Sequence, residues 1–561
     1  MNGSMQASTL AAVPAVLAGI DALFRRALRY TREQVTSAAD ANQALDHCQV
    51  QGYEFAMINA ELYAGNAIID YARLCMTEPG GVEHGAAFES HLAGAFVAEI
   101  LLKLRARFEK IRHLTGLSAR EVGHAFESAE AERFNTIHLA PAFLETTAAQ
   151  ILEHGGHGRS LLDEDKQIIA ASFARIADDI VAPQAERIHR DDANIPEDII
   201  SALVEMGCFA LSIPEAYGGT APASGHDNLA MCVVTEELSR SSLAAAGSPL
   251  TRPEILSRAL MAGGHEPQKQ RWLPGIASGK PIVAIAVTEP DCGSDVAAVR
   301  LRASATAGGY LLNGAKTWCT FAGRAGLLMV LARTDPDPGA GHRGLTLFLL
   351  EKPPGDEKAL EFRQPSGGVL SGQAIPTIGY RGMHSYTLFF DNVFVPDENI
   401  IGGAAGLGKG FYHTMAGFAG GRLQTAARAC GVMRAAFQAA VRYAQDRRVF
   451  GLPLADYQLT RAKLVSMAAN LRACQEMTYG VARLMDQGRG QMEASLVKLY
   501  ACRAAEHVTR EAMQIHGGMG YSEETAVSRY FVDARVLSIF EGAEETLALK
   551  VVARELILKG E

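Results

Sequence analysis

The sequence predicts an α+β protein in which a β domain of about 110 residues lies between helical regions. Two observations support this. Through most of the chain, apolar residues recur every three to four positions, which is the period of an amphipathic helix. Between residues 282 and 395, that period gives way to short β-rich runs separated by turn residues. Because the links between these runs are too short for crossover helices, we expect antiparallel pairing.

Residues 1–158 are expected to form a helical extension. It contains an apolar stripe at helical spacing, made of Phe96, Ile100, Leu101, Leu104 and Phe108. The extension ends at a glycine-rich breaker over 155–158, where we place a linker. For His154 and His157, in and beside this linker, we expect exposure to solvent. A metal site is the alternative, but no nearby residues complete a ligand set.

Residues 159–283 again have a helical pattern, and residues 284–402 are expected to form the middle β domain. Acidic residues at 163–165 are typical of a first helical turn. In the middle domain, Asn313 and Gly314 predict a hairpin turn. The expected strands are 282–287, 310–312, 327–331, 345–350 and 389–395.

Residues 403–561 are expected to form a C-terminal helical bundle. Its long apolar-periodic segments are 433–450, 459–485 and 492–515, and its last helix is 546–558. The glycine-rich run at 406–410 is similar to a dinucleotide-binding fingerprint. However, no hydrophobic strand leads into it and no acidic residue follows at the required distance. We therefore expect a flexible loop that enters a helix, not a Rossmann site.

Composition excludes several classes of protein. With 48% hydrophobic and 20% charged residues, the 561-residue chain is neither disordered nor fibrous. A net charge of −9 argues against general attraction to nucleic acid or anionic lipid. The apolar run at 10–20 is too short to span a membrane and contains Pro14. No basic residue precedes Arg25, which argues against a secretory or transit segment. Nine scattered cysteines without a CxxC pair favour reduced thiols, so we expect a cytoplasmic protein.

Four segments stand out by their joint order and spacing. The segment VTEPDCGSD at 287–295 ends a strand and enters a loop, and NGAKTWCT at 313–320 leads into a strand with one of the two tryptophans. The segment QIHGGMGY at 514–521 ends a helix, and RVLSIFEG at 535–542 precedes the last one. Each alone could be structural, as turn glycines, a core tryptophan or a solvated glutamate. Their joint occurrence makes coincidence an inadequate explanation.

Together these segments make residues 160–561 similar to the acyl-CoA dehydrogenase family of flavoenzymes. The similarity includes the run RRVFG at 447–451 and the Tyr-Gln pair at 457–458. It implies a helical domain, an antiparallel β-barrel-like middle domain and a C-terminal four-helix bundle, here with an extra N-terminal helical extension. It also implies α,β-dehydrogenation of an acyl-CoA thioester with FAD as the hydride acceptor.

The resemblance assigns the catalytic base to Glu541. Removing the acidic α-proton of a thioester requires a base. A carboxylate between Phe540 and Gly542 would lose its water when substrate binds, which makes it a stronger base. The family also implies that the backbone N–H of Glu541 and a flavin hydroxyl donate to the thioester oxygen. Taken in isolation, Glu541 could instead be a surface acid that caps a helix.

By position, the resemblance implies FAD contacts at Val287, Thr288, Ser294, Trp318, Thr320, Arg447, Phe450, Gln514, Gly517 and Gly518. Arg447 and Phe450 match residues that reach the FAD of a partner subunit, which implies a homo-oligomer, with a dimer preferred. A forked guanidinium suits a pyrophosphate, and glycines allow close backbone approach. Substrate contacts are implied at Ser294, Arg422 and Gly542. The alternative for Arg422 is a cation on a helix surface.

The extension is uncommon in the family, and the combined layout resembles a member that acts on a short dicarboxylic acyl group. The free carboxylate of such a group must be buried, and it then requires a cation or several donors. Arg252 lies in the segment that lines the acyl pocket in the family, although an ordinary exposed arginine fits the sequence equally well. We further expect residues 1–154 to pack on their own chain and to occupy the surface that a second dimer would use.

Electron-transferring flavoprotein is the electron acceptor that the resemblance implies. No metal, nucleic acid or membrane partner is expected. Three alternatives stay open: a dehydrogenase for another short or branched acyl-CoA, an acyl-CoA oxidase of the same fold, and a non-catalytic helical scaffold. Retention of Glu541 counts against the scaffold.

Overall fold

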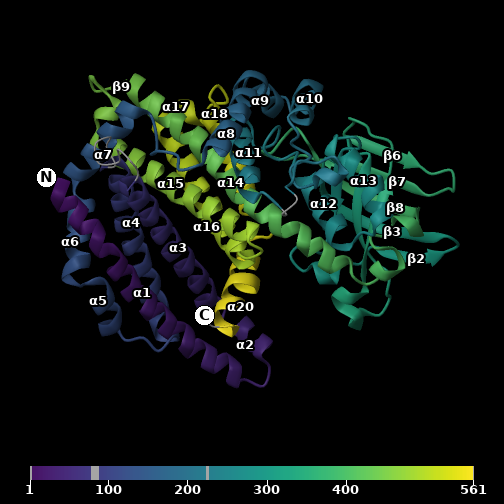
Figure 1. Cartoon of the computed structure of the whole chain (residues 1–561), viewed down its shortest axis with the longest axis horizontal. Coiled ribbons are helices and arrows are strands. Elements are labelled where there is room, and N and C mark those ends of the chain that lie inside the picture. The colour runs from purple at the N-terminus through teal and green to yellow at the C-terminus, as the bar shows by residue number, and fades with distance from the viewer. Residues whose placement is uncertain (1–2, 78–86, 223–225, 560–561) are drawn as a thin grey trace. The chain divides into compact units, whose positions relative to one another are not determined.

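The computed structural model describes residues 3–77, 87–222 and 226–559. The chain forms two compact units, whose elements are labelled in Figure 1. The first consists of Met1–Ile168 and Thr425–Glu561, and the second of Ile169–Gln424. The two ends of the sequence therefore belong to one unit.

The N-terminal extension is built of helices. They are α1 (Gly3–Ser37), α2 (Ala41–His47), α3 (Gln49–Thr77), α4 (Ala87–Ile111), α5 (Ala119–Phe126), α6 (Ala129–His138) and α7 (Pro141–His154). Helix α1 continues through Pro14. Helix α5 begins with a capping box between Ser118 and Glu121. The predicted apolar stripe on α4 is confirmed, because all five of its side chains are buried.

The extension packs against the C-terminal helices of its own chain. Helices α3 and α4 both contact α15 (Gln458–Asp486), and α3 also contacts α16 (Gln491–His516). Polar links accompany this packing, since the Ser466 hydroxyl donates to Glu99 over 3.0 Å. The expectation that residues 1–154 pack on their own chain is therefore confirmed.

The linker after α7 is attached to α15. Gly155 caps α7 with a left-handed φ of 63°, as glycine allows. Arg472 then donates to the backbone carbonyls of His157 and Gly158, over 3.0 and 2.8 Å. Burial, with Arg472 nearby, lowers the pKa of His157 well below its ordinary value. The predicted exposure is confirmed for His154, whereas His157 is half-buried because the linker folds onto the bundle.

The C-terminal part of the first unit is also helical. Its elements are the end of α14 (Gly410–Asp446), α15, α16, α17 (Gly518–Tyr521), α18 (Ala526–Leu537), α19 (Glu544–Thr546), a π-helical segment Leu547–Ala553 and α20 (Arg554–Leu558). The predicted helix to residue 450 is too long. It ends at Asp446, and a hairpin of β9 (Arg448–Val449) and β10 (Leu452–Pro453) follows. The glycine-rich run at 406–410 enters α14, as expected.

The second unit combines helices with a sheet. Its helices are the end of α8 (Glu164–Ile176), α9 (Ala182–Arg190), α10 (Glu197–Glu205), α11 (Asn228–Ser241), α12 (Thr251–Gly263) and α13 (Glu266–Ala277). Its strands are β1 (Val283–Ala286), β2 (Arg302–Thr306), β3 (Gly309–Thr320), β4 (Leu327–Arg333), β5 (Leu345–Glu351), β6 (Ala359–Arg363), β7 (Val369–Ile375) and β8 (Ser385–Pro396). All the predicted strand regions contain strands.

The strands form one sheet in the order β1-β4-β2-β3-β8-β7-β6, and β5 also pairs with β4. The consecutive strands that pair do so antiparallel, as expected, and they are β2–β3, β4–β5, β6–β7 and β7–β8. Strand β4, however, runs parallel to β1 and meets β2 in parallel at a single pair, because strands that are not consecutive can be joined by a longer path.

The predicted hairpin turn at Asn313 and Gly314 is wrong. Both residues lie inside β3, and the hairpin between β2 and β3 turns at Gly308, where φ is 76°. Opposite β8, the register shifts between Leu312 and Gly314, so this site is a β-bulge. The Asn313 side chain accepts from the backbone N–H of Asn392 on β8 over 3.0 Å. The Asn-Gly pair therefore bends a long strand instead of ending it.

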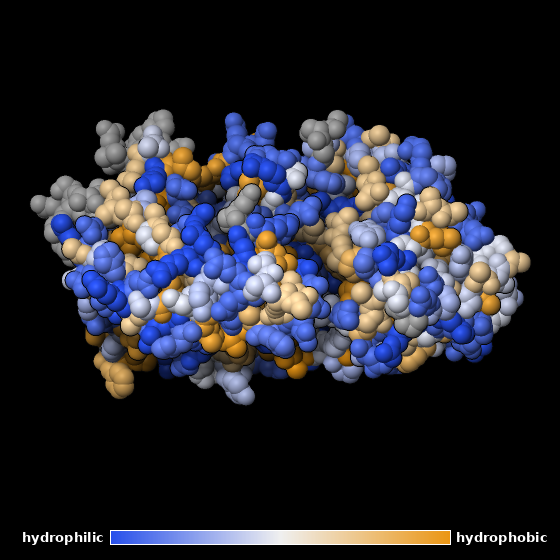
Figure 2. All heavy atoms as spheres, turned by 90° about the horizontal axis from the view of Figure 1, so that it is seen from below, coloured by the Kyte–Doolittle hydropathy of each residue, from blue (hydrophilic) through white to orange (hydrophobic). Residues whose placement is uncertain are grey.

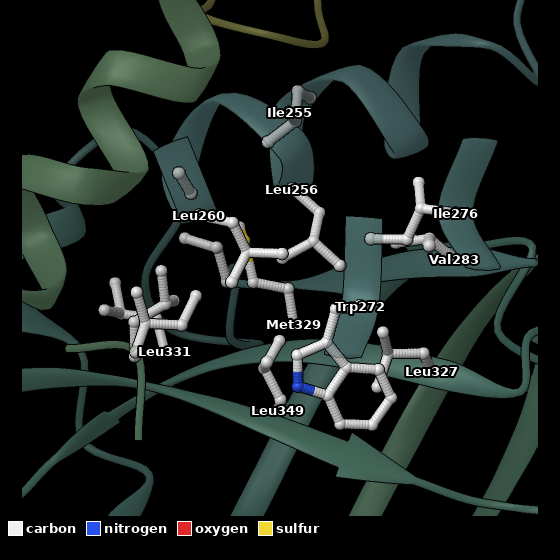
Figure 3. Packing of buried hydrophobic residues seen from close by; sticks show 14 of the residues in the cluster. Ile255, Leu256, Leu260, Trp272, Ile276, Val283, Leu327, Met329, Leu331 and Leu349 are labelled. Atoms are coloured by element: carbon white, nitrogen blue, oxygen red, sulfur yellow. The ribbon is translucent and has the colours of Figure 1, made fainter. Parts of the chain in front are cut away.

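Two hydrophobic clusters cover opposite faces of β4. Leu327, Met329 and Leu331 point toward α12 and α13, where Figure 3 shows them with Leu256 and Trp272. The alternate residues of β4 belong to the cluster on the other face of the sheet. This two-sided burial explains why the strand has an uninterrupted apolar sequence.

The surface carries no extended apolar band on the face drawn in Figure 2, where hydrophilic and hydrophobic residues are interspersed. Within the described ranges, no helix is both long and apolar enough to cross a membrane.

Candidate active site

Glu541 lies in the turn between α18 and α19, and its backbone has the left-handed φ of 53°. The next residue, Gly542, has a φ of 101°, and a Cβ there would lie 2.8 Å from Leu547. The conformation therefore favours glycine at 542, and a larger residue would also require the end of the Leu547 side chain to move. The buried Lys498 donates to the Gly542 carbonyl over 2.6 Å. The contact from Lys498 thus holds a turn in which two successive residues have a left-handed backbone.

The Glu541 carboxylate contacts two side chains of α14. The Thr425 hydroxyl donates to one oxygen over 2.8 Å, and Arg428 donates to both oxygens over 3.0 and 3.1 Å. Only 8% of the Glu541 side chain is exposed, and none of the Arg428 side chain. The guanidinium also lies 5.1 Å from the centre of the Phe540 ring. Glu541 is thus a nearly buried acid with a defined orientation, not an exposed helix cap.

Thr425 and Arg428 belong to no motif in the sequence analysis. Their spacing of three residues places them on the same face of α14. The available signal was an arginine in the small apolar run AARAC at 426–430, since a charge in such a run needs a partner.

In the second unit, Val287 and Thr288 follow directly after β1. Their loop is held by Glu289, whose carboxylate accepts from the backbone N–H groups of Arg300 and Leu301 over 2.8 and 2.7 Å. Lys316 from β3, which is fully buried, donates to Glu289 and to the Val287 carbonyl, each over 2.8 Å. Burial lowers the pKa of Lys316, and Glu289 opposes that effect. The first two motifs are therefore joined by a buried ion pair.

Trp318 and Thr320 lie at the end of β3 near this loop. Thr317 donates its backbone N–H to the Thr288 carbonyl over 2.9 Å, which joins β3 to the loop. Trp318 has a φ of 57°, and 55% of it is exposed. Thr320 is buried, and its hydroxyl lies 2.9 Å from that of Ser385. The fold brings Val287, Thr288, Trp318 and Thr320 together, while Ser294 lies exposed further along the loop.

Lys316→Met is expected to lower the free energy of unfolding by about 3–5 kcal/mol, because it leaves the Glu289 carboxylate buried without its cation. Urea unfolding of the full chain measures this. Lys358→Met is the matched control, since Lys358 pairs with Asp192 at an exposed site, and its loss is expected to cost less than about 1 kcal/mol. Equal losses in the two variants would contradict a structural role for the buried pair.

The remaining proposed cofactor residues belong to the first unit. Arg447 is exposed and precedes the β9–β10 hairpin, and Phe450 is 97% exposed at its tip. Gln514 lies in the last turn of α16, followed by Gly517 with a φ of 58° and Gly518. All three are exposed. The cofactor-binding roles of all five residues stay predictions.

Arg252 is not an ordinary exposed arginine. It lies on α12 and is only 7% exposed. Its guanidinium donates to the Ser248 carbonyl over 2.9 Å and to the Tyr380 hydroxyl over 3.2 Å. In the described part of the chain, no carboxylate lies within ion-pair distance of it. Arg422, on α14, is half-buried.

Within residues 3–77, 87–222 and 226–559, no group of three histidine, cysteine, aspartate or glutamate residues is placed to hold an ion. All nine cysteines are free, and eight of them are buried.

Three family models match the chain in succession. They describe the N-terminal domain of acyl-CoA dehydrogenase over residues 163–280, the middle domain over 284–393 and the C-terminal domain over 408–557. The helical extension precedes all three. The division of the chain into two units does not test the bounds of the four predicted domains, which stay predictions.

The chain is similar to characterised proteins along its length. It is 36% identical to (2S)-methylsuccinyl-CoA dehydrogenase of Cereibacter sphaeroides, over 96% of both chains. It is 30% identical to the structure of butyryl-CoA dehydrogenase from Megasphaera elsdenii, with a TM-score of 0.64 over 71% of this chain and 100% of that one. A glutaryl-CoA dehydrogenase from Mycobacterium smegmatis, solved in complex with FADH2, is 26% identical with a TM-score of 0.61, over 71% of this chain and 95% of that one. The predicted fold is confirmed, and the chain belongs to the acyl-CoA dehydrogenase family of flavin-dependent enzymes.

Proposed function

We propose that this enzyme uses FAD to desaturate the α,β bond of a short, dicarboxylic acyl-CoA, with Glu541 as the base. The observation that supports this most directly is the Glu541 carboxylate, which is nearly buried, is held by two side chains and belongs to a residue with a left-handed backbone. A carboxylate held in one orientation can act as a general base on a proton brought within hydrogen-bond distance. The α-proton would pass to a Glu541 oxygen as the α C–H bond breaks.

The residues at the end of β3 fit a flavin. Trp318 offers an exposed aromatic side chain, Thr288 lies in the loop that the neighbouring Thr317 contacts, and Thr320 follows two residues along β3. An extended apolar ring with polar edges needs this combination of a flat apolar contact and hydrogen-bond donors. When bound, the flavin accepts the hydride that leaves the β-carbon. The related M. smegmatis structure with FADH2 supports FAD as the form used.

The backbone N–H of Glu541 is suited to bind the thioester oxygen. In the described ranges it donates to no other group, although the neighbouring Gly542 carbonyl is engaged by Lys498. A donor already aimed at an oxygen stabilises the negative charge that develops there when the α-proton leaves. Ser294, Arg422 and Gly542 are proposed to contact the rest of the substrate.

Arg252 supports a dicarboxylic substrate. A buried guanidinium whose contacts are a carbonyl and a hydroxyl keeps an uncompensated positive charge. A carboxylate at the distal end of the acyl group would neutralise it. Similarity to the C. sphaeroides enzyme suggests (2S)-methylsuccinyl-CoA as substrate and mesaconyl-CoA as product, a step of the ethylmalonyl-CoA pathway. Electron-transferring flavoprotein is the proposed acceptor, and the cytoplasm the proposed location.

The test is anaerobic titration of the purified yellow protein with acyl-CoA thioesters. We expect methylsuccinyl-CoA to bleach the flavin absorbance faster than butyryl-CoA or isovaleryl-CoA does. Faster bleaching by a monocarboxylic thioester would contradict the dicarboxylic assignment. Rapid recovery of colour in air without an added acceptor would identify an oxidase instead.

We also propose a homodimer with FAD at the subunit interface. A nearly fully exposed phenylalanine at a hairpin tip, Phe450, is suited to a contact with a second copy. Light scattering is expected to give about twice 59.9 kDa. A tetramer would contradict the idea that the extension occupies the second-dimer surface. A monomer that retains stoichiometric FAD would contradict the shared site.

A further inference from the structure

The proposed base is bound to a permanent cation. Both oxygens of Glu541 contact Arg428, and one also accepts from Thr425. The guanidinium has no exposed surface, and it is fixed further by a 3.0 Å contact to the Thr425 hydroxyl and by the Phe540 ring. Because arginine stays protonated at any accessible pH, this charge is constant.

The pair has two physical consequences. A cation at hydrogen-bond distance stabilises the negative charge of the Glu541 carboxylate. One guanidinium nitrogen, Nη2, contacts both oxygens, and together with the Thr425 hydroxyl it restricts the orientation of the carboxylate, which reduces the entropy lost on reaching the reactive geometry. Neither consequence requires Arg428 to touch the substrate.

The other ionisable groups near the turn have partners of their own or are neutral. They are Lys498, Cys502, Arg503 and Glu506 on α16, Arg535 on α18, Glu544 after the turn and Tyr53 on α3. Lys498 binds the Gly542 carbonyl, and burial raises the pKa of Cys502 to about 12, so this thiol is neutral. Glu506 accepts from Arg535 over 3.2 Å, and Glu544 from Arg503 over 2.6 Å and from Tyr53. Arg428 is the cation that contacts the Glu541 carboxylate in the described structure.

We propose that Arg428 is a positioning residue that keeps Glu541 ionised and oriented before the α-proton is taken. The contact weakens when the proton reaches a Glu541 oxygen, since a neutral acid attracts the guanidinium less. This inference rests on the proposed role of Glu541 as the base.

The experiment uses the full-length, FAD-loaded protein and compares wild type with Arg428→Gln. We expect the acid limb of the pH profile of kcat/KM to move upward by about one to three pH units, because loss of a nearby cation favours the protonated acid. Activity recovers at high pH, where Glu541 ionises without help. Arg428→Lys, which keeps the charge, is expected to retain most of the wild-type limb.

A second readout does not depend on turnover. Infrared difference spectra between the R428Q protein and the R428Q/E541Q protein isolate the Glu541 carboxyl, and its ionisation is expected to shift upward with the kinetic limb. If R428Q fails to fold, Thr425→Val tests the same idea, because it removes one donor to the carboxylate and is expected to move the limb in the same direction by less.

Arg472→Gln is the matched control. Arg472 is also a buried arginine of the first unit, but it binds the linker carbonyls and Glu476. Its loss is expected to lower stability without moving the acid limb. An unchanged limb and an unchanged infrared titration in R428Q, while E541Q is inactive, would overturn the role of Arg428. Near-normal turnover by E541Q would instead overturn the proposed base.

Discussion

Glu541→Gln is expected to fold and retain flavin but to lose dehydrogenation by a factor on the order of 10²–10⁴ or more. The amide has the shape of the carboxylate and can still contact Thr425 and Arg428. It cannot accept the α-proton at neutral pH. Stopped-flow measurement of flavin bleaching under anaerobic conditions separates this step from the later transfer of electrons to an acceptor.

Glu544→Gln is the control for that variant. Glu544 lies three residues further along, at the start of α19, and binds Arg503, so its substitution tests for a general disturbance of the segment. We expect the rate of flavin bleaching to change by less than about tenfold. Near-normal bleaching by the Glu541→Gln protein would refute the assignment of the base, whatever the behaviour of the control.

Arg252→Gln is expected to lower kcat/KM for methylsuccinyl-CoA by about 10²-fold or more, since a desolvated charge pair is worth about 2–5 kcal/mol. With butyryl-CoA, which has no distal carboxylate, we expect kcat/KM of the same variant to be unchanged or higher, because an uncompensated buried charge has been removed. The measurement is the ratio of the two kcat/KM values, which does not depend on the active fraction of each preparation.

Arg258→Gln is the matched control for Arg252. It lies on the same helix and is also largely buried, but Glu254 and Asn228 are its partners, at 2.8 and 2.7 Å. Its loss is expected to reduce stability while leaving the substrate ratio unchanged. A fall in kcat/KM of equal size for both substrates in the Arg252 variant would show that Arg252 supports the fold and does not select the acyl group.

Several local features could be predicted because they depend on short stretches of chain. The apolar stripe on α4 follows from a spacing of three to four residues, and the strands of the sheet from β-rich runs between turns. The Glu-Gly pair at 541 and 542 is also a local signal, since its left-handed backbone favours glycine at the second position. These features can be predicted without knowing which other elements pack against them.

Other local predictions failed where distant segments intervened. Asn313 and Gly314 carry the pattern of a hairpin turn, but pairing with β8, about 80 residues further along, makes them a bulge. The histidine at 157 has the flanking glycines of a solvated linker, yet Arg472 binds its carbonyl and holds the linker on α15. In both cases a long-range contact outweighed the preference of the local sequence.

The sequence by itself therefore determined the fold class, the order of the helical and β regions, the family and the candidate base. Only the tertiary structure decided how the ionic groups are paired. It joined Lys316 to Glu289, brought Arg428 to Glu541 across more than a hundred residues and left Arg252 buried with neutral partners. The physical reason is that periodicity reports which face of an element is buried, whereas the partner of a buried charge depends on which elements the fold packs together.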